Sequence, residues 1–267
     1  MRFTKMHGAG NDYVYVDCFA HPAPENPAEL ARRISDRHFG VGADGLILIC
    51  PSEQADAEMQ MYNADGSGSE MCGNGIRCVA KYVYERRICR GDTLQIDSVG
   101  NVYQLKLRIE NDKVRRLRVD MCEPVLTPSR IPTTLAQGEQ QAIDVPLTID
   151  GHELKVSCVS MGNPHCVVFV EDLNDDLVLG LGPKIENDPH FPERVNVEFA
   201  HIHKPREVWQ RTWERGSGET LACGTGACAV GVAAMTSGYM KREIIVHLTG
   251  GDLEIEWDYD SNHVFMT

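Results

Sequence analysis

No apolar run in the chain approaches the length of a membrane-spanning helix. Basic residues are the minority charge: 26 Lys and Arg stand against 39 Asp and Glu, which gives a net charge of −13 without any long acidic run. A negative charge spread in this way disfavours nucleic acid or an anionic membrane as a partner. The start of the chain, Met1–Lys5, leads directly into patterned sequence and not into a signal peptide, so we expect a cytoplasmic protein.

The chain also lacks any Cys-x-x-Cys pair, although it has ten cysteines. The spacings Cys72/Cys78 and Cys223/Cys228 fit neither a zinc knuckle nor a thioredoxin-type redox site. We therefore expect reduced thiols and no metal. Most of these thiols are expected to be small core residues, including Cys18, Cys50, Cys78, Cys122, Cys158, Cys166 and Cys228.

Two cysteines stand apart because each opens a glycine-rich turn, Cys72–Gly75 and Cys223–Gly226. Each turn precedes a small-residue stretch with the pattern of a helix, 76–84 and 227–235. A thiol beside the first free backbone N–H groups of a helix is expected to have a lowered pKa and to adjoin an anion site. Two such turns predict two thiols that face one ligand, one as base and one as acid.

Other residues recur in the two halves of the sequence with nearly the same separation along the chain. The two cysteines lie 151 positions apart (223 − 72), and Asn11 and Asn163 lie 152 apart (163 − 11). Asn63 and Glu214 each stand nine positions before their cysteine. This repetition predicts two homologous halves. The period is too long for a solenoid, whose repeats are much shorter.

Most of the chain reads as strands, and few helices are expected. Nine alternating or β-rich segments predict strands: 13–17, 46–49, 58–62, 93–97, 103–109, 155–159, 166–170, 243–247 and 253–257. In the stretch Lys113–Arg118, basic residues alternate with apolar ones, and the basic side chains are expected to lie on the solvent-exposed face of a strand. A helix is expected over 27–37, with Asn26 as N-cap and Pro27 at its first position. Gly91 and Gly238 are expected to end the two helices behind the cysteines.

The predicted fold class is α+β, with two pseudo-symmetric domains of mostly antiparallel strands, each wrapped around one central helix. We expect residues 1–119 to form the N-terminal half, which residues 264–267 could complete, and residues 120–263 to form the C-terminal half.

A set of motifs in this chain resembles the diaminopimelate epimerase family, which contains cofactor-independent isomerases. The motifs run in family order from end to end: Lys5–Asp12, Asp36–Asp44, Asn63–Ser67, Met71–Cys78, Ser160–His165, Phe191–Asn196, Glu214–Thr220 and Ala222–Cys228. The resemblance implies the two-domain epimerase fold, with the active site in the cleft between the halves.

The resemblance also implies roles for individual residues. Cys72 and Cys223 would be the acid/base pair, with His165 and Glu214 close enough to tune their ionisation. The residues expected to hold the substrate are Asn11, Asn63, Gly73, Asn74, Asn163, Asn196, Glu214, Arg215, Gly224 and Thr225. The expected partner is a small amino acid, and the expected assembly is a homodimer.

Two features depart from the family pattern. Gly45 stands where one branch has a substrate-contacting glutamine, and the chain ends at Thr267 where family members usually continue.

Three other functions compete with epimerisation of LL- and meso-2,6-diaminopimelate. The main alternative is a cofactor-independent racemase of another amino acid. The residues that contact the distal end of the substrate would distinguish this activity from epimerisation of diaminopimelate. A cysteine hydrolase would pair one thiol with a histidine such as His7, His165 or His201, but it would leave the second cysteine turn unexplained. A non-catalytic binding module would need the anion-binding turns and not the thiols.

Overall fold

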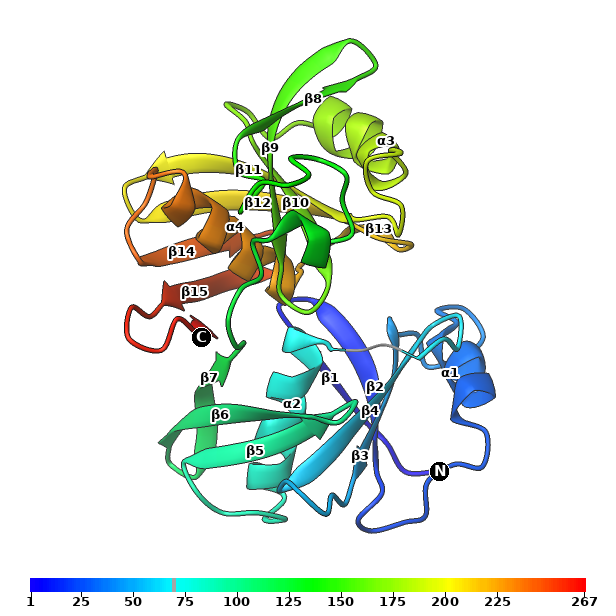
Figure 1. Cartoon of the computed structure of the whole chain (residues 1–267). Helices are drawn as coiled ribbons and strands as arrows, with labels where there is room; N and C mark the ends of the chain where they lie inside the picture. The colour runs from blue at the N-terminus through cyan, green and yellow to red at the C-terminus, as the bar shows by residue number, and fades with distance from the viewer. Residues whose placement is uncertain (69–70) are drawn as a thin grey trace. The chain divides into compact units, whose positions relative to one another are not determined.

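The structure is a computed structural model that describes residues 1–68 and 71–267. The chain folds into two compact units, residues 1–120 and 121–267, and each is a mixed α+β unit (Figure 1). The predicted α+β fold class is confirmed.

The first unit is one sheet with two helices. Its strands hydrogen-bond in chain order, from β1 to β7. The elements are β1 Thr4–Gly8, β2 Asn11–Asp17, α1 Pro27–Ser35, β3 Gly45–Cys50, β4 Ala57–Asn63, α2 Gly73–Glu85, β5 Thr93–Ser98, β6 Asn101–Glu110 and β7 Lys113–Asp120. Neighbouring strands are antiparallel except β2 with β3 and β4 with β5, which are parallel because α1 and α2 cross over between them.

The second unit has the sheet order β16-β15-β14-β12-β11-β10-β9-β8, and β13 pairs with β12. Its strands are β8 Val145–Ile149, β9 His152–Ser160, β10 Pro164–Phe169, β11 Asn196–Lys204, β12 Glu207–Glu214, β13 Gly218–Thr220, β14 Glu243–Leu248, β15 Gly251–Trp257 and β16 Val264–Met266. Its helical segments are the 3₁₀ turn η1 Pro128–Arg130, the π-helical η2 Asp176–Leu181, α3 Gly182–Glu186 and α4 Gly224–Thr236.

The same order of elements occurs in both units. A helical crossover joins the parallel strands β10 and β11, as α1 joins β2 and β3. Helix α4 joins the parallel strands β12 and β14, as α2 joins β4 and β5. Both cysteine turns therefore lie at the start of the second crossover helix of their unit.

Both crossover helices pack against their own sheet. Helix α2 contacts β1, β2, β4, β5 and β7, and α4 contacts β9, β10, β11, β14, β15 and β16. In α4 every residue from 224 to 234 is buried, which explains its small, apolar sequence. Because each helix is held along its length, its first turn is a rigid support for the cysteine that precedes it.

Helix boundaries differ in part from the sequence-based expectation. Helix α1 has the predicted N-cap, since the Asn26 side chain accepts from the Glu29 N–H. Gly238 follows the end of α4 with a φ of +76°, as expected. The prediction for Gly91 is wrong: α2 ends at Glu85, and Arg87 takes the left-handed conformation with a φ of +64°.

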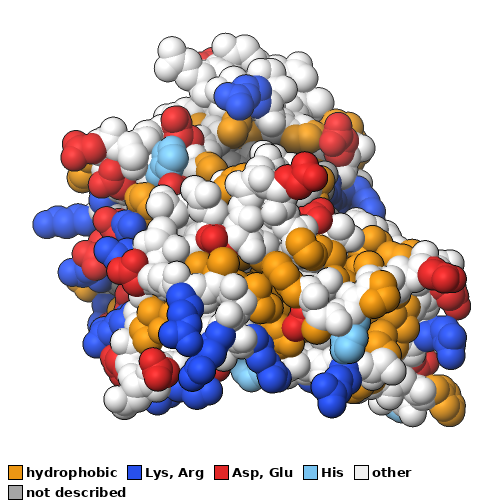
Figure 2. Space-filling view, turned by 90° about the horizontal axis from the view of Figure 1, so that it is seen from below, with side chains coloured by type: hydrophobic (Ala, Val, Ile, Leu, Met, Phe, Trp, Pro, Cys, Tyr) orange, Lys and Arg blue, Asp and Glu red, His pale blue; other side chains and the backbone are white. Residues whose placement is uncertain are grey.

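The surface carries charges of both signs. On the face drawn in Figure 2, Lys and Arg side chains lie among Asp and Glu side chains, with hydrophobic side chains exposed between them. Of the cysteines expected in the core, Cys122 is exposed, because it turns the chain just after β7 with a φ of +63°, and Cys18 is half-buried. None of the helices among the described residues is long and apolar enough to cross a membrane.

Candidate active site

Cys72 is the N-cap of α2. Its backbone is extended, and its Sγ accepts a hydrogen bond from the Gly75 N–H over 3.2 Å. The thiol also contacts the Asn11 side chain, with 3.4 Å between Sγ and Oδ1. The chain thus places a partly exposed sulfur at the positive end of a helix.

Cys223 is the N-cap of α4 in the same way. Its Sγ accepts from the Gly226 N–H over 3.4 Å, and it lies 3.4 Å from the Thr225 hydroxyl. Unlike Cys72, this side chain is buried, with 6% of its surface exposed. Ser, Thr, Asp and Asn are the usual N-caps, and a thiol is a weaker acceptor. A cysteine in both caps therefore points to chemistry that needs sulfur.

In the first unit, four further side chains form a network around Cys72. Asn11 donates from Nδ2 to Asp44 over 2.7 Å and accepts at Oδ1 from Asn74 over 3.4 Å. Arg77, one turn into α2, donates to the Gly73 carbonyl over 2.9 Å and to Asn74 Oδ1 over 2.8 Å. Asn74 and Arg77 are buried, so the guanidinium holds the first turn of α2 in shape.

Asn63 lies at the end of β4, and its side chain donates to Ser67 Oγ over 3.0 Å within the turn that follows. Gly45 pairs with Asn63 across β3 and β4. A Cβ at position 45 would lie 2.2 Å from the Tyr62 carbonyl oxygen and 2.9 Å from the Tyr13 ring, so this backbone leaves no room for a glutamine there.

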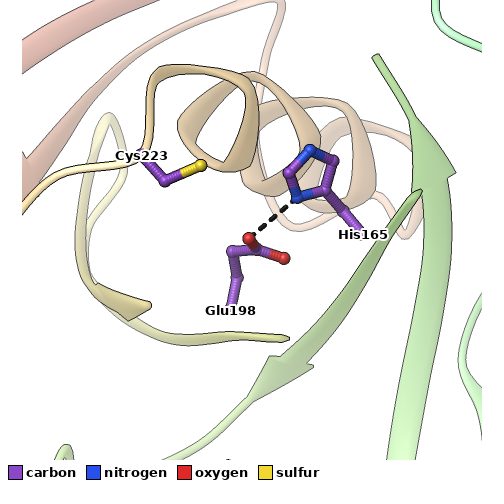
Figure 3. Close-up of side chains that lie close together, drawn as sticks. All are labelled: His165, Glu198 and Cys223. Carbon is purple, nitrogen blue, oxygen red and sulfur yellow. Dashed lines mark hydrogen bonds and ion pairs between the residues drawn. The ribbon is translucent and has the colours of Figure 1, made fainter. Parts of the chain in front are cut away.

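In the second unit, the side chains of His165, Glu198 and Cys223 lie close together beside helix α4 (Figure 3). His165 and Glu198 are fully buried, and 2.8 Å separates His165 Nδ1 from Glu198 Oε1. Each of the three residues has one nitrogen, oxygen or sulfur atom that could bind a metal, and these atoms lie within 4.8 Å of one another. A metal ion could bridge atoms at this spacing. The hydrogen bond between His165 and Glu198 lies within this cluster.

A chain of hydrogen bonds continues from His165 to Cys223. His165 Nε2 lies 2.9 Å from Asn163 Oδ1, and Asn163 Nδ2 donates to Thr225 Oγ1 over 3.3 Å. The Thr225 hydroxyl in turn lies against the Cys223 sulfur. Since the Asn163 oxygen can only accept, His165 donates its Nε2 proton to it. The structure thus brings together the predicted residues Asn163, His165, Cys223 and Thr225.

The pKa of Cys223 moves in the direction opposite to the expectation from its glycine turn. Burial raises the pKa of the Cys223 thiol well above its ordinary value, and the carboxylates of Glu214 and Glu198 raise it further. The Thr225 hydroxyl and the Gly226 N–H lower it, but they are outweighed. The expectation of a lowered pKa is therefore wrong for this thiol, because burial and neighbouring charge depend on tertiary structure.

Glu214 and Arg215 lie at the end of β12 and just after it. The Thr220 hydroxyl donates to Glu214 Oε1. The Arg215 backbone N–H donates to Asn196 Oδ1 over 2.9 Å, and Asn196 Nδ2 donates to the Pro164 carbonyl over 2.9 Å. Asn196 is buried and uses both ends of its amide on backbone groups, so it fixes the chain at Arg215.

Two residues of these networks were missed by sequence reasoning. Glu198 falls in a strand that the sequence patterns did not reveal, although its two-residue spacing from Asn196 puts both side chains on one face. Arg77 follows Cys72 within the predicted helix, yet nothing in its spacing indicates that it turns back toward the helix start.

The fold is that of known racemases and isomerases. A probable proline racemase from Agrobacterium radiobacter K84 matches with a TM-score of 0.71 and 14% identity, over 99% of this chain and 87% of the other. A methylitaconate-delta-isomerase matches with a TM-score of 0.64 and 14% identity, over 99% and 92%. At these identities the likeness concerns the fold alone.

The sequence comparisons specify the family. The model of the family described as diaminopimelate epimerase matches residues 3–127 and 157–267. Proteins named diaminopimelate epimerase from Acetivibrio thermocellus and Desulfovibrio desulfuricans are 50% and 51% identical to the chain, over all of it and 94% of each relative. The chain belongs to the diaminopimelate epimerase family and is an isomerase, which confirms both the resemblance seen in its motifs and the predicted enzyme class.

Proposed function

We propose that the protein interconverts LL- and meso-2,6-diaminopimelate, a step in the synthesis of lysine and peptidoglycan precursors, by inverting one α-carbon of the substrate. The observation that carries the proposal is the pair of cysteine N-caps at Cys72 and Cys223. The names of relatives at about half identity over the full chain support the choice of substrate.

The proposed reaction transfers two protons. A thiolate takes the α-proton from one face, so that the C–H bond breaks, an S–H bond forms and the electron pair stays on the α-carbon, delocalised into the carboxylate. The other thiol gives its proton to the opposite face, so that its S–H bond breaks and a new C–H bond forms. The two sulfurs have then exchanged protonation states, and the reverse reaction begins from the product state. No cofactor takes part in this scheme.

The backbone N–H groups at the starts of α2 and α4 would stabilise the negative charge that forms on the substrate in this reaction. An α-proton is less acidic than a thiol by roughly ten pKa units, which corresponds to about 14 kcal/mol. N–H groups at the N-termini of α2 and α4, including those in the turns Gly73-Asn74 and Gly224-Thr225, would stabilise charge on the substrate carboxylate. Each unit contributes one such terminus and one sulfur, and we take each unit as one epimerase half.

The two thiols have different parts in this proposal. Because its burial and the nearby carboxylates raise the pKa of Cys223, this residue starts as the thiol. The scheme then assigns proton delivery to Cys223 and proton removal to Cys72, whose sulfur is more exposed.

The remaining predicted site residues would hold the substrate. Asn11, Asn74 and Asn163 would orient the reacting end, and Glu214 would pair with the distal ammonium group. Arg215 would hold the distal carboxylate with its guanidinium fork, together with Asn63 and Asn196. Arg215 Nη1 donates to the Glu193 carbonyl over 3.2 Å, which sets the direction of the side chain.

Proton exchange tests the function. The protein is incubated in deuterated buffer with LL-diaminopimelate, and separately with monocarboxylate amino acids such as proline and histidine. We expect α-deuterium and inverted configuration in diaminopimelate only. Faster exchange into another amino acid would assign the protein to the alternative racemase activity, and cleavage without exchange would assign it to a hydrolase.

We further propose that the enzyme works in the cytoplasm as a homodimer. Sedimentation equilibrium at micromolar protein concentration tests the assembly, and a monomer mass would reject the dimer.

A further inference from the structure

Glu198 is a buried carboxylate that lies between His165 on β10 and the first turn of helix α4. Parallel pairing of β10 with β11 puts His165 opposite Asn196 and Val167 opposite Glu198. Glu198 reaches back along this face to His165, with 2.8 Å between Oε1 and Nδ1 (Figure 3). Its other oxygen, Oε2, is buried without a hydrogen-bond partner among the described residues.

The start of helix α4 is pressed against this carboxylate. A Cβ on Gly226 would lie 2.6 Å from Glu198 Oε1 and 3.2 Å from Cys223 Cβ. Only glycine lets the helix approach so closely. The positive end of α4 then faces a buried negative charge, an arrangement that stabilises the carboxylate and orients it toward the cysteine.

The proton on His165 has a fixed direction in this arrangement. Nε2 donates to Asn163, so Nδ1 is the atom that meets Glu198, and a second proton lies between Nδ1 and Oε1 because a carboxylate oxygen only accepts. Asn163 is in turn oriented to donate to Thr225, whose hydroxyl can then donate to the Cys223 sulfur. Glu198 therefore anchors the far end of a hydrogen-bond chain that ends on Cys223.

We propose that Glu198 is a positioning residue for the reaction: it anchors His165 so that Asn163 and Thr225 are held against Cys223, and its charge adds to the burial of the site and to Glu214 in favouring the protonated form of Cys223. The role in turnover rests on the proposed epimerisation, whereas the effect on the thiol does not.

Other ionisable groups face the same sulfur. Glu214 comes from the end of β12, His165 from β10, and the Glu198 charge also acts on Cys166, the neighbour of His165. Burial and both carboxylates raise the pKa of Cys223. Removing one carboxylate should therefore lower the pKa without abolishing the effect of burial.

The test compares Glu198→Gln with the unmodified full-length protein. The rate at which iodoacetamide alkylates Cys223 is followed from pH 6 to 11 by mass spectrometry of the Cys223 peptide. We expect the midpoint in Glu198→Gln to fall by about one pH unit, which corresponds to about tenfold faster alkylation below the midpoint. An unchanged or raised midpoint in a folded Glu198→Gln protein would overturn the proposal.

Two further variants separate charge from packing. Glu207→Gln removes a carboxylate at the start of β12 that pairs with Lys204, and it should leave the Cys223 midpoint unchanged. Glu198→Asp keeps the charge but shortens the reach to His165, so the midpoint should stay within a few tenths of a unit of the unmodified protein while kcat falls. If Glu198→Gln does not fold, the Asp variant decides: a midpoint lowered as far as one unit would show that packing, and not charge, controls the thiol.

Activity measurements distinguish the proposed epimerase function from the proposed role of Glu198. A lowered midpoint in a protein that never exchanges the α-proton of diaminopimelate would reject the proposed function and leave the effect of Glu198 on the thiol standing. Normal epimerisation with an unchanged midpoint and unchanged kcat in Glu198→Gln would reject the positioning role alone.

Discussion

Cys72 and Cys223 occupy the same position in their two helices. Each is the residue before the first helical residue, and each sulfur accepts a hydrogen bond from the N–H of the third residue after it, Gly75 or Gly226. The two differ in burial, since Cys72 is partly exposed and Cys223 is buried. The repeated position favours a shared type of chemistry, and the difference in burial gives the two sulfurs different surroundings.

The first prediction concerns the two thiols. Replacing either Cys72 or Cys223 by Ala should lower kcat for epimerisation by about 10²–10⁴-fold, because each face of the α-carbon would lose its only proton carrier. The measurement is the conversion of LL- to meso-diaminopimelate by chiral chromatography. Cys122→Ala, at an exposed cysteine, serves as the control and should keep full activity. Turnover above a few per cent in either site variant would refute the two-thiol mechanism.

The second prediction concerns Arg215. Arg215→Ala should cost about 2–5 kcal/mol in kcat/KM for diaminopimelate, since a charge-assisted contact to the distal carboxylate is lost. Arg215→Lys should recover only part of this, because an ammonium group cannot reproduce the planar fork. Arg194→Ala is the matched control: Arg194 pairs with Glu186, and its loss should change kcat/KM little.

The Arg215 experiment also needs a substrate without a distal carboxylate. Any residual activity on a monocarboxylate amino acid should be nearly indifferent to Arg215→Ala. An equal loss for both substrates would mean that Arg215 supports the fold or the thiols.

The third prediction concerns stability at alkaline pH. Burial raises the pKa of Cys50 to about 12. An unfolded chain ionises this thiol from about pH 8.5, whereas the folded chain keeps it protonated to higher pH. The protonated thiol therefore contributes stability below the unfolded pKa, and this contribution is lost as the pH rises toward 12, with a slope of up to about 1.4 kcal/mol per pH unit.

Urea denaturation at several values between pH 8 and 11 measures this slope. The free energy of unfolding should fall less steeply with pH in Cys50→Ala than in the unmodified protein, whereas Cys122→Ala should leave the slope unchanged. Identical slopes in all three proteins would contradict the assignment of the loss to Cys50.

The fourth prediction concerns Gly45. Gly45→Ala should destabilise the first unit by about 3 kcal/mol, because its Cβ would lie 2.2 Å from the Tyr62 carbonyl oxygen and the paired strands would have to separate. Gly180→Ala is the control, since a Cβ there would meet open space. Thermal unfolding followed by circular dichroism compares them, and equal melting temperatures would show that β3 and β4 adjust without cost.

The sequence was informative where local patterns determine structure. The Cys-Gly turns predicted two helix starts, Asn26 and Pro27 predicted the start of α1, and the alternation in 113–118 predicted β7. Each of these features depends on a few neighbouring residues. The motif set also identified the family, because the spacing and order of many short motifs rarely recur by chance.

The sequence was less informative where distant residues meet. The raised pKa of Cys223 depends on burial and on Glu198, which comes from a strand whose pattern was not detected. The end of α2 depends on Arg87, which takes a conformation that usually favours glycine. The double use of the Asn196 amide could be seen only once Pro164 and Arg215 were brought beside it.

The sulfur that caps each helix is also the proposed proton carrier, and this double use has a consequence for inhibitors. A reagent that alkylates Cys223 would force a larger group against the start of a buried helix as well as block proton transfer. Overpacking of a buried site costs about 1–3 kcal/mol, so covalent inhibitors should lower the melting temperature where tight reversible ligands raise it. The sign of a thermal shift would then distinguish the two kinds of inhibitor in a screen before any activity is measured.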